Sequence, residues 1–159
     1  MERLELRMYG LVPYNISPIQ QGIQFGHAVV EYGRTCEGMK NHENHYKDWA
    51  DNWKTFIILN GGTTNTNFST DDGLPFGSMN RHLLALNEMG VRFATFHEPD
   101  LGDQLTAIVF IVDERIFNRT KYPDPQPFAT QEEQLLFMES IGGEKNYKLR
   151  EFLKQFRLA

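Results

Sequence analysis

Alternating and continuous runs of apolar residues divide the chain into expected strands and helices. An alternating stretch at residues 4–12 and a continuous apolar run at 54–62 predict two strands. The second run closes with two glycines, which is typical of a buried parallel strand. Two further strands are predicted at 91–98 and 105–114, and the short link PDLGDQ makes them antiparallel neighbours.

Helical spacing of apolar residues occurs between and after these strands. The predicted helices span residues 17–33, 42–54 and 78–90, followed by two near 130–140 and 146–156 after a Pro-rich connection. In the first helix, Ile19, Ile23 and Val30 are predicted to form the packed face, with Phe25 as a further candidate. In the third, Ser78 is the predicted N-cap and His82 is expected to face solvent.

The order of these elements predicts an α/β protein. Each strand–helix–strand connection brings two strands into a parallel pair, and the last hairpin adds one antiparallel pair. The expected fold is a three-layer α/β sandwich with a mixed four-stranded sheet. We expect a single domain over residues 1–159, with a core at 4–113 and a C-terminal helical extension at 114–159. Ligands of such folds bind at the carboxyl ends of the strands.

Composition limits the classes of protein that fit. With 159 residues and 40% hydrophobic content, the chain can bury one substantial core. No apolar run approaches the roughly 18 residues that span a bilayer, and the N-terminus alternates charge and apolarity, unlike a signal peptide. Cys36 is the single cysteine, which excludes an internal disulfide and a cysteine-rich zinc site. A cytoplasmic protein without a membrane partner is expected.

Charge is unevenly distributed along the chain. Residues 145–159 hold five Lys/Arg and one acid, whereas residues 1–144 hold eleven basic and twenty acidic residues. A basic end on an acidic body can bind an anionic ligand locally, although such a run is more often a solvated helix face. The net charge of −5 argues against a protein that coats nucleic acid without specificity.

Several common sites are missing from the sequence. It contains no Gly-Lys-Ser/Thr phosphate loop, no G-x-G-x-x-G and no G-x-S-x-G. His42 and His45 lie three residues apart beside Glu43, but no third ligand follows at a defined metal spacing. We therefore expect neither a metal nor an organic cofactor.

Polar side chains cluster at two positions where the chain leaves a predicted strand. Gln20, Gln24 and His27 lie near the start of the first helix, and Glu98 and Asp100 follow the third strand. Because both positions lie at carboxyl ends of strands, we expect these side chains to share one edge of the sheet. Taken alone, these residues fit a functional site no better than they fit the polar rim of a helix and an ordinary turn.

Three segments carry a likeness to a known family: QFGHAVVEY after the first strand, EPDLGDQLTAIVFI at the last hairpin, and the ending YKLREFLKQFRL. With the order of elements, they resemble the archaeal and eukaryotic-type (class II) peptidyl-tRNA hydrolase family, the ending being similar to a divergent branch of it. The Gln-x-x-His-Ala motif of that family matches Gln24, His27 and Ala28, and a threonine that opens its last strand matches Thr106. The resemblance covers about residues 7–113 and the tail.

The resemblance implies hydrolysis of the ester that joins a peptide or an N-blocked amino acid to the 3′ end of tRNA, commonly by a homodimer. A water must be activated, an oxyanion stabilised and phosphates held. The implied catalytic residues are His27 for proton transfer or hydrogen bonding, Gln24 to position water or substrate, Glu98 to orient the set and Thr106 to donate to a carbonyl. The tail and the loop at 61–77 are expected to help hold RNA. The implied substrate-binding residues are Gln20, Asp100, Lys154 and Arg157.

The sequence departs from the family at one charged position. Gln20 stands where the first helix of the family begins with a lysine, so an ammonium group that would stabilise a phosphate or oxyanion is missing. Three functions stay open: a peptidyl-tRNA hydrolase-like enzyme, a module that binds a nucleotide or a tRNA end without turnover, and a scaffold. In the scaffold, Trp49, Trp53 and Phe56 would face a protein partner.

Overall fold

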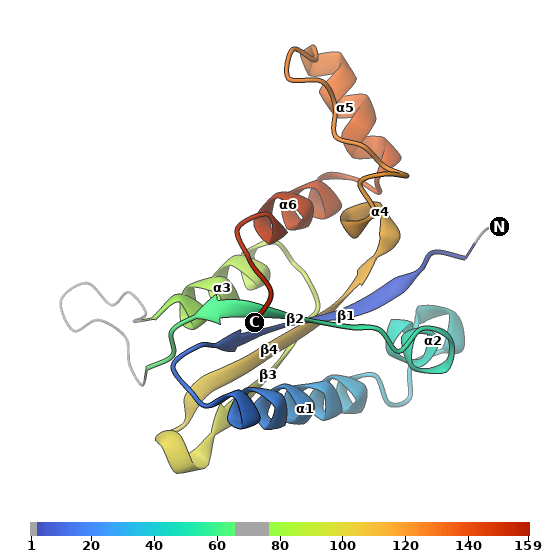
Figure 1. Cartoon of the computed structure of the whole chain (residues 1–159). Coiled ribbons are helices and arrows are strands. Elements are labelled where there is room, and N and C mark those ends of the chain that lie inside the picture. Colours follow the sequence, from blue (N-terminus) through green and yellow to red (C-terminus); the bar gives the residue numbers. More distant parts are fainter. Residues whose placement is uncertain (1–2, 66–76) are drawn as a thin grey trace.

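A four-stranded sheet with helices on both faces forms the centre of the molecule (Figure 1). The computed structural model describes residues 3–65 and 77–159, and no helix in these ranges is long and apolar enough to cross a membrane. The strands are β1 (Leu6–Pro13), β2 (Phe56–Gly62), β3 (Ala94–Glu98) and β4 (Gln104–Asp113). The helices are α1 (Pro18–Thr35), α2 (His45–Asn52), α3 (Ser78–Glu88), α4 (Glu114–Phe117), α5 (Gln131–Ser140) and α6 (Glu144–Leu153), with 3-10 turns at Asn41–Glu43 and Pro99–Leu101. The expected α/β class with a mixed four-stranded sheet is confirmed.

The order of strands in the sheet is β2-β1-β4-β3. β1 and β2 are parallel, whereas β4 lies between β1 and β3 and is antiparallel to both. The predicted hairpin of β3 and β4 is confirmed, but β4 forms two antiparallel pairs where the sequence predicts one. β2 is parallel to β1 as predicted, but it lies at the edge of the sheet and is only partly buried, with Leu59 and Gly61 buried and Phe56 exposed. This order brings the carboxyl ends of β1 and β3 and the start of β4 to the same end of the sheet.

The C-terminal tail covers the outer edge of β2. Leu158 pairs with Leu59 in an antiparallel bridge. The backbone N–H of Asn60 donates to the carbonyl of Arg157 at 2.8 Å, and that of Ala159 donates to Ile58 at 3.0 Å. An unpaired edge strand exposes backbone groups that can pair with another molecule and cause aggregation. The tail satisfies these groups on β2 and so protects this edge of the sheet.

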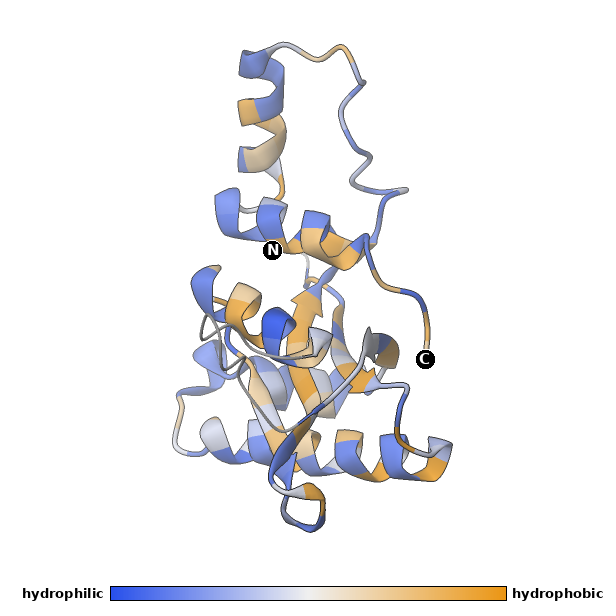
Figure 2. Cartoon of the chain, turned by 90° about the vertical axis from the view of Figure 1, so that its left-hand side faces the viewer, coloured by the Kyte–Doolittle hydropathy of each residue, from blue (hydrophilic) through white to orange (hydrophobic). Residues whose placement is uncertain are grey.

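Apolar side chains fill the space on both faces of the sheet. α1 and α2 cover one face, where Phe25 and Val29 pack against Met8 of β1. α3, α4 and α6 cover the other face, where Leu86 and Leu149 belong to a second buried cluster. Figure 2 shows the apolar strands between these helices. The three layers position the start of α1 beside the end of β3.

The packed face of α1 differs from the predicted one. Ile19, Ile23 and Val30 are 74%, 46% and 60% exposed, so they do not contact the sheet as expected, whereas the further candidate Phe25 is buried. The helix begins as a serine-capped helix should, with the hydroxyl of Ser17 accepting from the N–H of Gln20. The residues of α1 that are buried are Gln24, Phe25, Ala28, Val29 and Tyr32.

Gly10, in the middle of β1, allows α1 to lie close to the sheet. The ring of Phe25 occupies the space where the Cβ of a larger residue would lie. We expect Gly10→Ala to lower the free energy of unfolding by about 1–3 kcal/mol, because the added methyl overpacks a closed interior. Chemical denaturation measures this loss. Gly22→Ala, whose methyl would meet nothing within 4 Å, is the control and should be neutral or stabilising. Equal stability of Gly10→Ala and the wild type would contradict this close packing.

Two predicted details of α3 are wrong. Gly77 is its N-cap, and the hydroxyl of Ser78 instead accepts from the N–H of Thr63 and donates to the carbonyl of Gly61 in β2. His82 is half-buried and not solvent-facing: its ring lies 4.7 Å from that of Phe156, centroid to centroid. Burial lowers the pKa of His82. The C-terminal segment therefore covers a surface that the sequence assigns to solvent.

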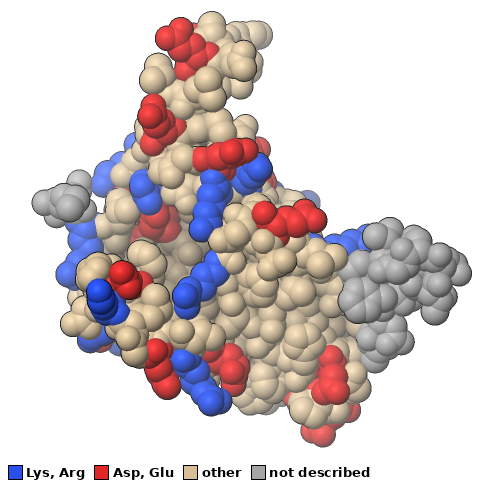
Figure 3. Space-filling model, turned by 180° about the vertical axis from the view of Figure 1, so that it is seen from behind, with Lys and Arg blue, Asp and Glu red and all other residues tan. Residues whose placement is uncertain are grey.

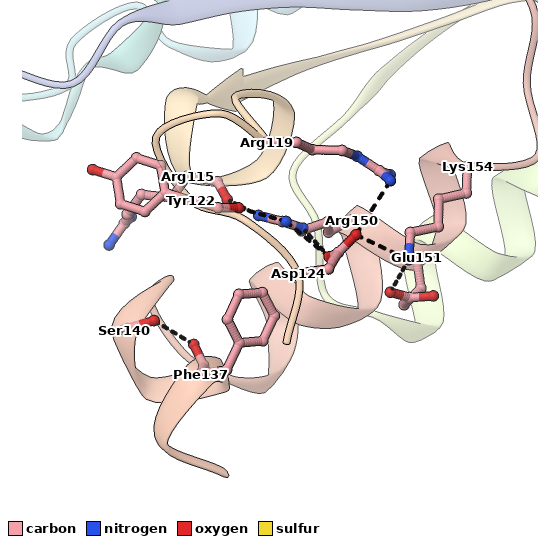
Figure 4. Close-up of polar contacts among 9 residues, drawn as sticks. All are labelled: Arg115, Arg119, Tyr122, Asp124, Phe137, Ser140, Arg150, Glu151 and Lys154. Atoms are coloured by element: carbon pink, nitrogen blue, oxygen red, sulfur yellow. Dashed lines mark hydrogen bonds and ion pairs between the residues drawn. The ribbon is translucent and has the colours of Figure 1, made fainter. Parts of the chain in front are cut away.

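Arg150 joins the C-terminal helices to the connection after α4 (Figure 4). Its side chain is fully buried, and it donates to Asp124 Oδ1 at 2.8 Å, to the carbonyl of Tyr122 at 2.6 Å and to that of Arg115 at 3.1 Å. The guanidinium lies over the ring of Phe137 on α5, 5.1 Å from its centroid. α5 itself has no buried residue and extends away from the sheet (Figures 1 and 2). The buried cation is therefore one of the contacts that attach α5, together with the ring contact of Phe137 with Tyr147 on α6.

Candidate functional site

Three elements bring the predicted site residues to one end of the sheet. α1 carries Gln20, Gln24 and His27, whose spacings of four and three place them on one side of the helix. β3 ends at Glu98, and β4 carries Thr106 beside it. This is the end of the sheet at which the carboxyl ends of β1 and β3 lie.

Gln24 is the centre of a hydrogen-bonded chain across these elements. Its side chain is 1% exposed. Its Nε2 donates to Glu98 Oε2 at 2.6 Å and to Gln20 Oε1 at 3.1 Å, and its Oε1 accepts from Thr106 Oγ1 at 2.8 Å. Both amide hydrogens and the oxygen thus have partners, as a buried amide requires. Gln24 therefore positions its neighbours, and the predicted role of contacting water or substrate directly does not fit its burial.

Thr106 lies in the interior below Gln24. Its side chain is fully buried, and its single hydroxyl hydrogen is directed to Gln24 Oε1 or to the carbonyl of Phe96 at 3.2 Å. The predicted donation to a substrate carbonyl does not fit this position, because no ligand in solvent reaches the hydroxyl. Thr106 acts on the site by fixing the orientation of the Gln24 amide.

Glu98 is the member of this hydrogen-bonded network that reaches the surface. Its Oε2 accepts from Gln24, and its Oε1 accepts from the backbone N–H of Asp100 at 3.1 Å. These two hydrogen bonds hold the pKa of Glu98 below its ordinary value of 4.5, against the raising effect of burial, and the charge of His27 lowers it further. The carboxylate is therefore ionised at neutral pH and accepts hydrogen bonds only.

His27 lies on the exposed side of α1 near this carboxylate. Its ring packs against Phe96, with 4.3 Å between centroids. No hydrogen bond or ion pair within residues 3–65 and 77–159 involves the side chain of His27. Its ring nitrogens are therefore available to water or to a ligand.

A cleft of about 510 Å³ opens beside Glu98, a size that suits a small ligand or one nucleoside. Gln20 forms part of its wall, and because Gln20 Oε1 accepts from Gln24, the Nε2 of Gln20 is left to donate to a ligand. The described lining holds two carboxylates and no Lys or Arg. Sequence analysis missed Asn15, Ile16 and Leu101, which lie in turns, and it assigned Ile23 of α1 to the core and not to this cleft. The lining residues are Asn15, Ile16, Ser17, Gln20, Ile23, Glu98, Asp100 and Leu101.

Two of the predicted substrate-binding residues lie elsewhere. Lys154, at the end of α6, forms ion pairs with two acids of the C-terminal segment. Arg157 follows in the tail that pairs with β2, and it lines a separate hollow. The structure therefore brings Gln20 and Asp100 to the cleft beside Glu98, and it does not bring Lys154 or Arg157 there.

Neither a metal-binding cluster in the described residues nor a similarity to a known protein adds evidence about this site. Among the residues that the structure describes, no three His, Cys, Asp or Glu side chains lie together so that they could hold a metal ion. Most of the loop at 61–77, which is predicted to help hold RNA, lies outside the described residues. No model of a known protein family matches the chain, and no curated protein matches its sequence.

Proposed function

We propose that the chain is a peptidyl-tRNA hydrolase-like protein with the fold of that family, and that it cleaves the ester between a peptide or an N-blocked amino acid and the 3′ end of tRNA. Besides the motif resemblance, one observation supports the proposal above the others: the hydrogen-bonded chain from Thr106 through Gln24 to Glu98, beside an open cleft. A satisfied buried network of this kind holds a reactive group in one orientation.

In the proposed reaction, Glu98 accepts a proton from a water whose oxygen attacks the ester carbonyl. The Nε2 of Gln20 donates to the oxygen that becomes negative, in the place of the family's lysine. The bond to the ribose oxygen then breaks, and that oxygen takes the proton from Glu98. His27, near the carboxylate and with its ring nitrogens without a partner in the described residues, hydrogen-bonds the attacking water.

A second candidate is a protein that binds the tRNA end without turnover. The cleft favours it in one respect, because it presents Glu98 and Asp100 and no cation among its described lining residues. Carboxylates accept hydrogen bonds from ribose hydroxyls, so a terminal nucleoside can bind there. The lowered pKa of Glu98 also makes this carboxylate a weaker base at neutral pH.

Release of the N-acetyl amino acid from N-acetyl-aminoacyl-tRNA distinguishes the two candidates. The hydrolase predicts multiple turnovers by the wild-type chain without added metal. If folded protein releases nothing, the hydrolase proposal is wrong. Saturable binding of deacylated tRNA, weakened by added salt, would then support the binding module.

His27→Ala is expected to lower kcat/KM in this assay about tenfold, the effect of one hydrogen bond to the attacking water that contributes about 1.4 kcal/mol in the transition state. The side chain is exposed, so folding should be unaffected. His97→Ala is the matched control. Both histidines are exposed and neither lines the cleft, but His27 acts on the charge of Glu98 whereas His97 does not, so the rate of His97→Ala should equal that of the wild type. Equal rates for all three proteins would remove His27 from the reaction.

A further inference from the structure

A second cleft, of about 370 Å³, lies at the opposite end of the sheet. It is bounded by the starts of β1 and of β3, the end of β4, and the N-terminal half of α6. Tyr32 marks its position on α1, eight residues after Gln24 and so roughly 12 Å along the helix from the first site. The face seen in Figure 3 is hollowed beside a group of Lys and Arg side chains.

The charge of this cleft is positive although the chain is acidic. Arg92, Arg115 and Lys145 line it, and Asp113 is the single carboxylate among the described lining residues. Arg115 holds both oxygens of Asp113, at 3.0 and 2.8 Å, so these two charges offset each other. The net positive charge therefore belongs to Arg92 and Lys145.

Arg92 and Lys145 have no carboxylate partner in the described parts of the chain. The guanidinium of Arg92 has only long contacts, 3.5 Å to the carbonyl of Thr35 and 3.8 Å to the sulfur of Cys36. Most other cations of α1, α2 and α6 pair with an acid on their own helix or nearby. Two unpaired cations at the rim of one cleft therefore attract an anion.

One wall of the cleft is apolar, and the polar side chains of His45 and Asn146 also line it. Val91, Ile111 and Leu149 line it together with Tyr32. Burial raises the pKa of Tyr32, so its phenol stays protonated and can act only as a neutral polar group. A ligand that fits both parts has a charged head and an apolar body, the usual combination of a few placed polar groups with an apolar wall.

We propose that this cleft binds a small organic anion, with a carboxylate or phosphate head at Arg92 and Lys145 and an aliphatic or aromatic body against Val91, Ile111 and Leu149. The site is separate from the cleft beside Glu98, and the proposal does not depend on the proposed hydrolase.

The test is a titration of ¹⁵N-labelled full-length chain, followed by amide NMR shifts, with sodium octanoate, octyl phosphate and 1-octanol. We expect saturable shifts at Val91, Arg92 and Lys145 with at least one of the two anions, and at least tenfold weaker binding of the uncharged alcohol. If only octyl phosphate saturates, the head is a phosphate, and if only octanoate does, it is a carboxylate. Absence of saturable shifts at these residues with both anions would overturn the proposal.

A double variant tests the two cations. Arg92→Gln with Lys145→Gln should weaken anion binding at least tenfold, and because both side chains are exposed the fold should be retained. Arg34→Gln with Lys148→Gln removes two exposed cations that pair with acids on their own helices, and it should leave the affinity unchanged. Equal affinities of the two double variants would overturn the assigned roles, whatever the hydrolase assay shows.

Discussion

Replacing Arg150 by methionine is expected to lower the free energy of unfolding by about 3 kcal/mol. Removing one partner of a buried ion pair generally costs about 3–5 kcal/mol. Asp124 is 37% exposed and can be hydrated again, which places the loss at the lower end of that range. The carbonyls of Tyr122 and Arg115 lose their donor and add to the cost. Urea denaturation measures the loss, and faster amide exchange in α6 should accompany it.

Lys148→Met is the control on the same helix. Its ammonium lies 3.1 Å from Glu144, with both side chains more than half exposed, so we expect a change within about 0.5 kcal/mol. If Arg150→Met were as stable as this control, a well-packed apolar side chain would replace the buried cation without cost. The network drawn in Figure 4 would then not anchor the C-terminal helices.

The same network makes stability depend on pH. Burial raises the pKa of Asp124, but the hydrogen bond and charge of Arg150, with the charges of Lys154 and Arg119, hold it below its ordinary value of 3.8. A carboxyl with a lowered pKa stabilises the folded chain above its unfolded pKa, and this contribution is lost as the pH falls through the folded pKa. The stability difference between wild type and Arg150→Met should therefore narrow below about pH 4.

The sequence predicted which segments are strands and helices better than which faces they bury. In α1, helical spacing assigned Ile19 and Ile23 to the core, yet both are exposed and Gln24 is buried instead. Gln24 is tolerated inside because Glu98 and Thr106, 74 and 82 residues away, satisfy its amide. Periodicity measures local apolarity and contains no information about partners so distant in the chain.

The candidate site was predicted in part because a motif, and not periodicity, selected its residues. The motif put Gln24 and Thr106 forward, and the structure joins them by a hydrogen bond. The basic charge of the tail and its likeness to the family put Lys154 and Arg157 forward, and neither lies at the cleft beside Glu98. A charge run records composition along the chain, whereas a site depends on which elements the sheet brings together.

The basic cleft and the buried cation escaped sequence reasoning for the same reason. Arg92 precedes β3, and Lys145 lies at the start of α6, so nothing in their spacing connects them. Arg150 belongs to the basic tail, yet it is fully buried and paired with Asp124. The order of strands and the path of the C-terminal segment decide these contacts, and both are tertiary properties.

Glu98→Gln is expected to lower kcat/KM for N-acetyl-aminoacyl-tRNA by about 10²–10⁴-fold, the usual contribution of a general base. The amide has nearly the same shape, and its oxygen can still accept from Gln24, so the fold should be kept. It cannot take a proton from water at neutral pH. Asp103→Asn, in the neighbouring turn and outside the cleft, removes one negative charge without this effect and should keep the wild-type rate. A Glu98→Gln protein with near wild-type turnover would show that Glu98 is not the base.

Gln24→Leu provides a second readout on the same carboxylate. Removing the strongest hydrogen bond to Glu98 should raise its pKa toward or above 4.5, because a donor that favours the charged form is lost. The reaction needs the ionised form, so the acidic limb of the pH profile of kcat/KM should move to higher pH in this variant. A merely structural role of Gln24 would lower the rate equally at every pH and leave that limb in place. A shifted limb in Gln24→Leu, together with loss of turnover in Glu98→Gln, would assign the base to Glu98 and its positioning to Gln24.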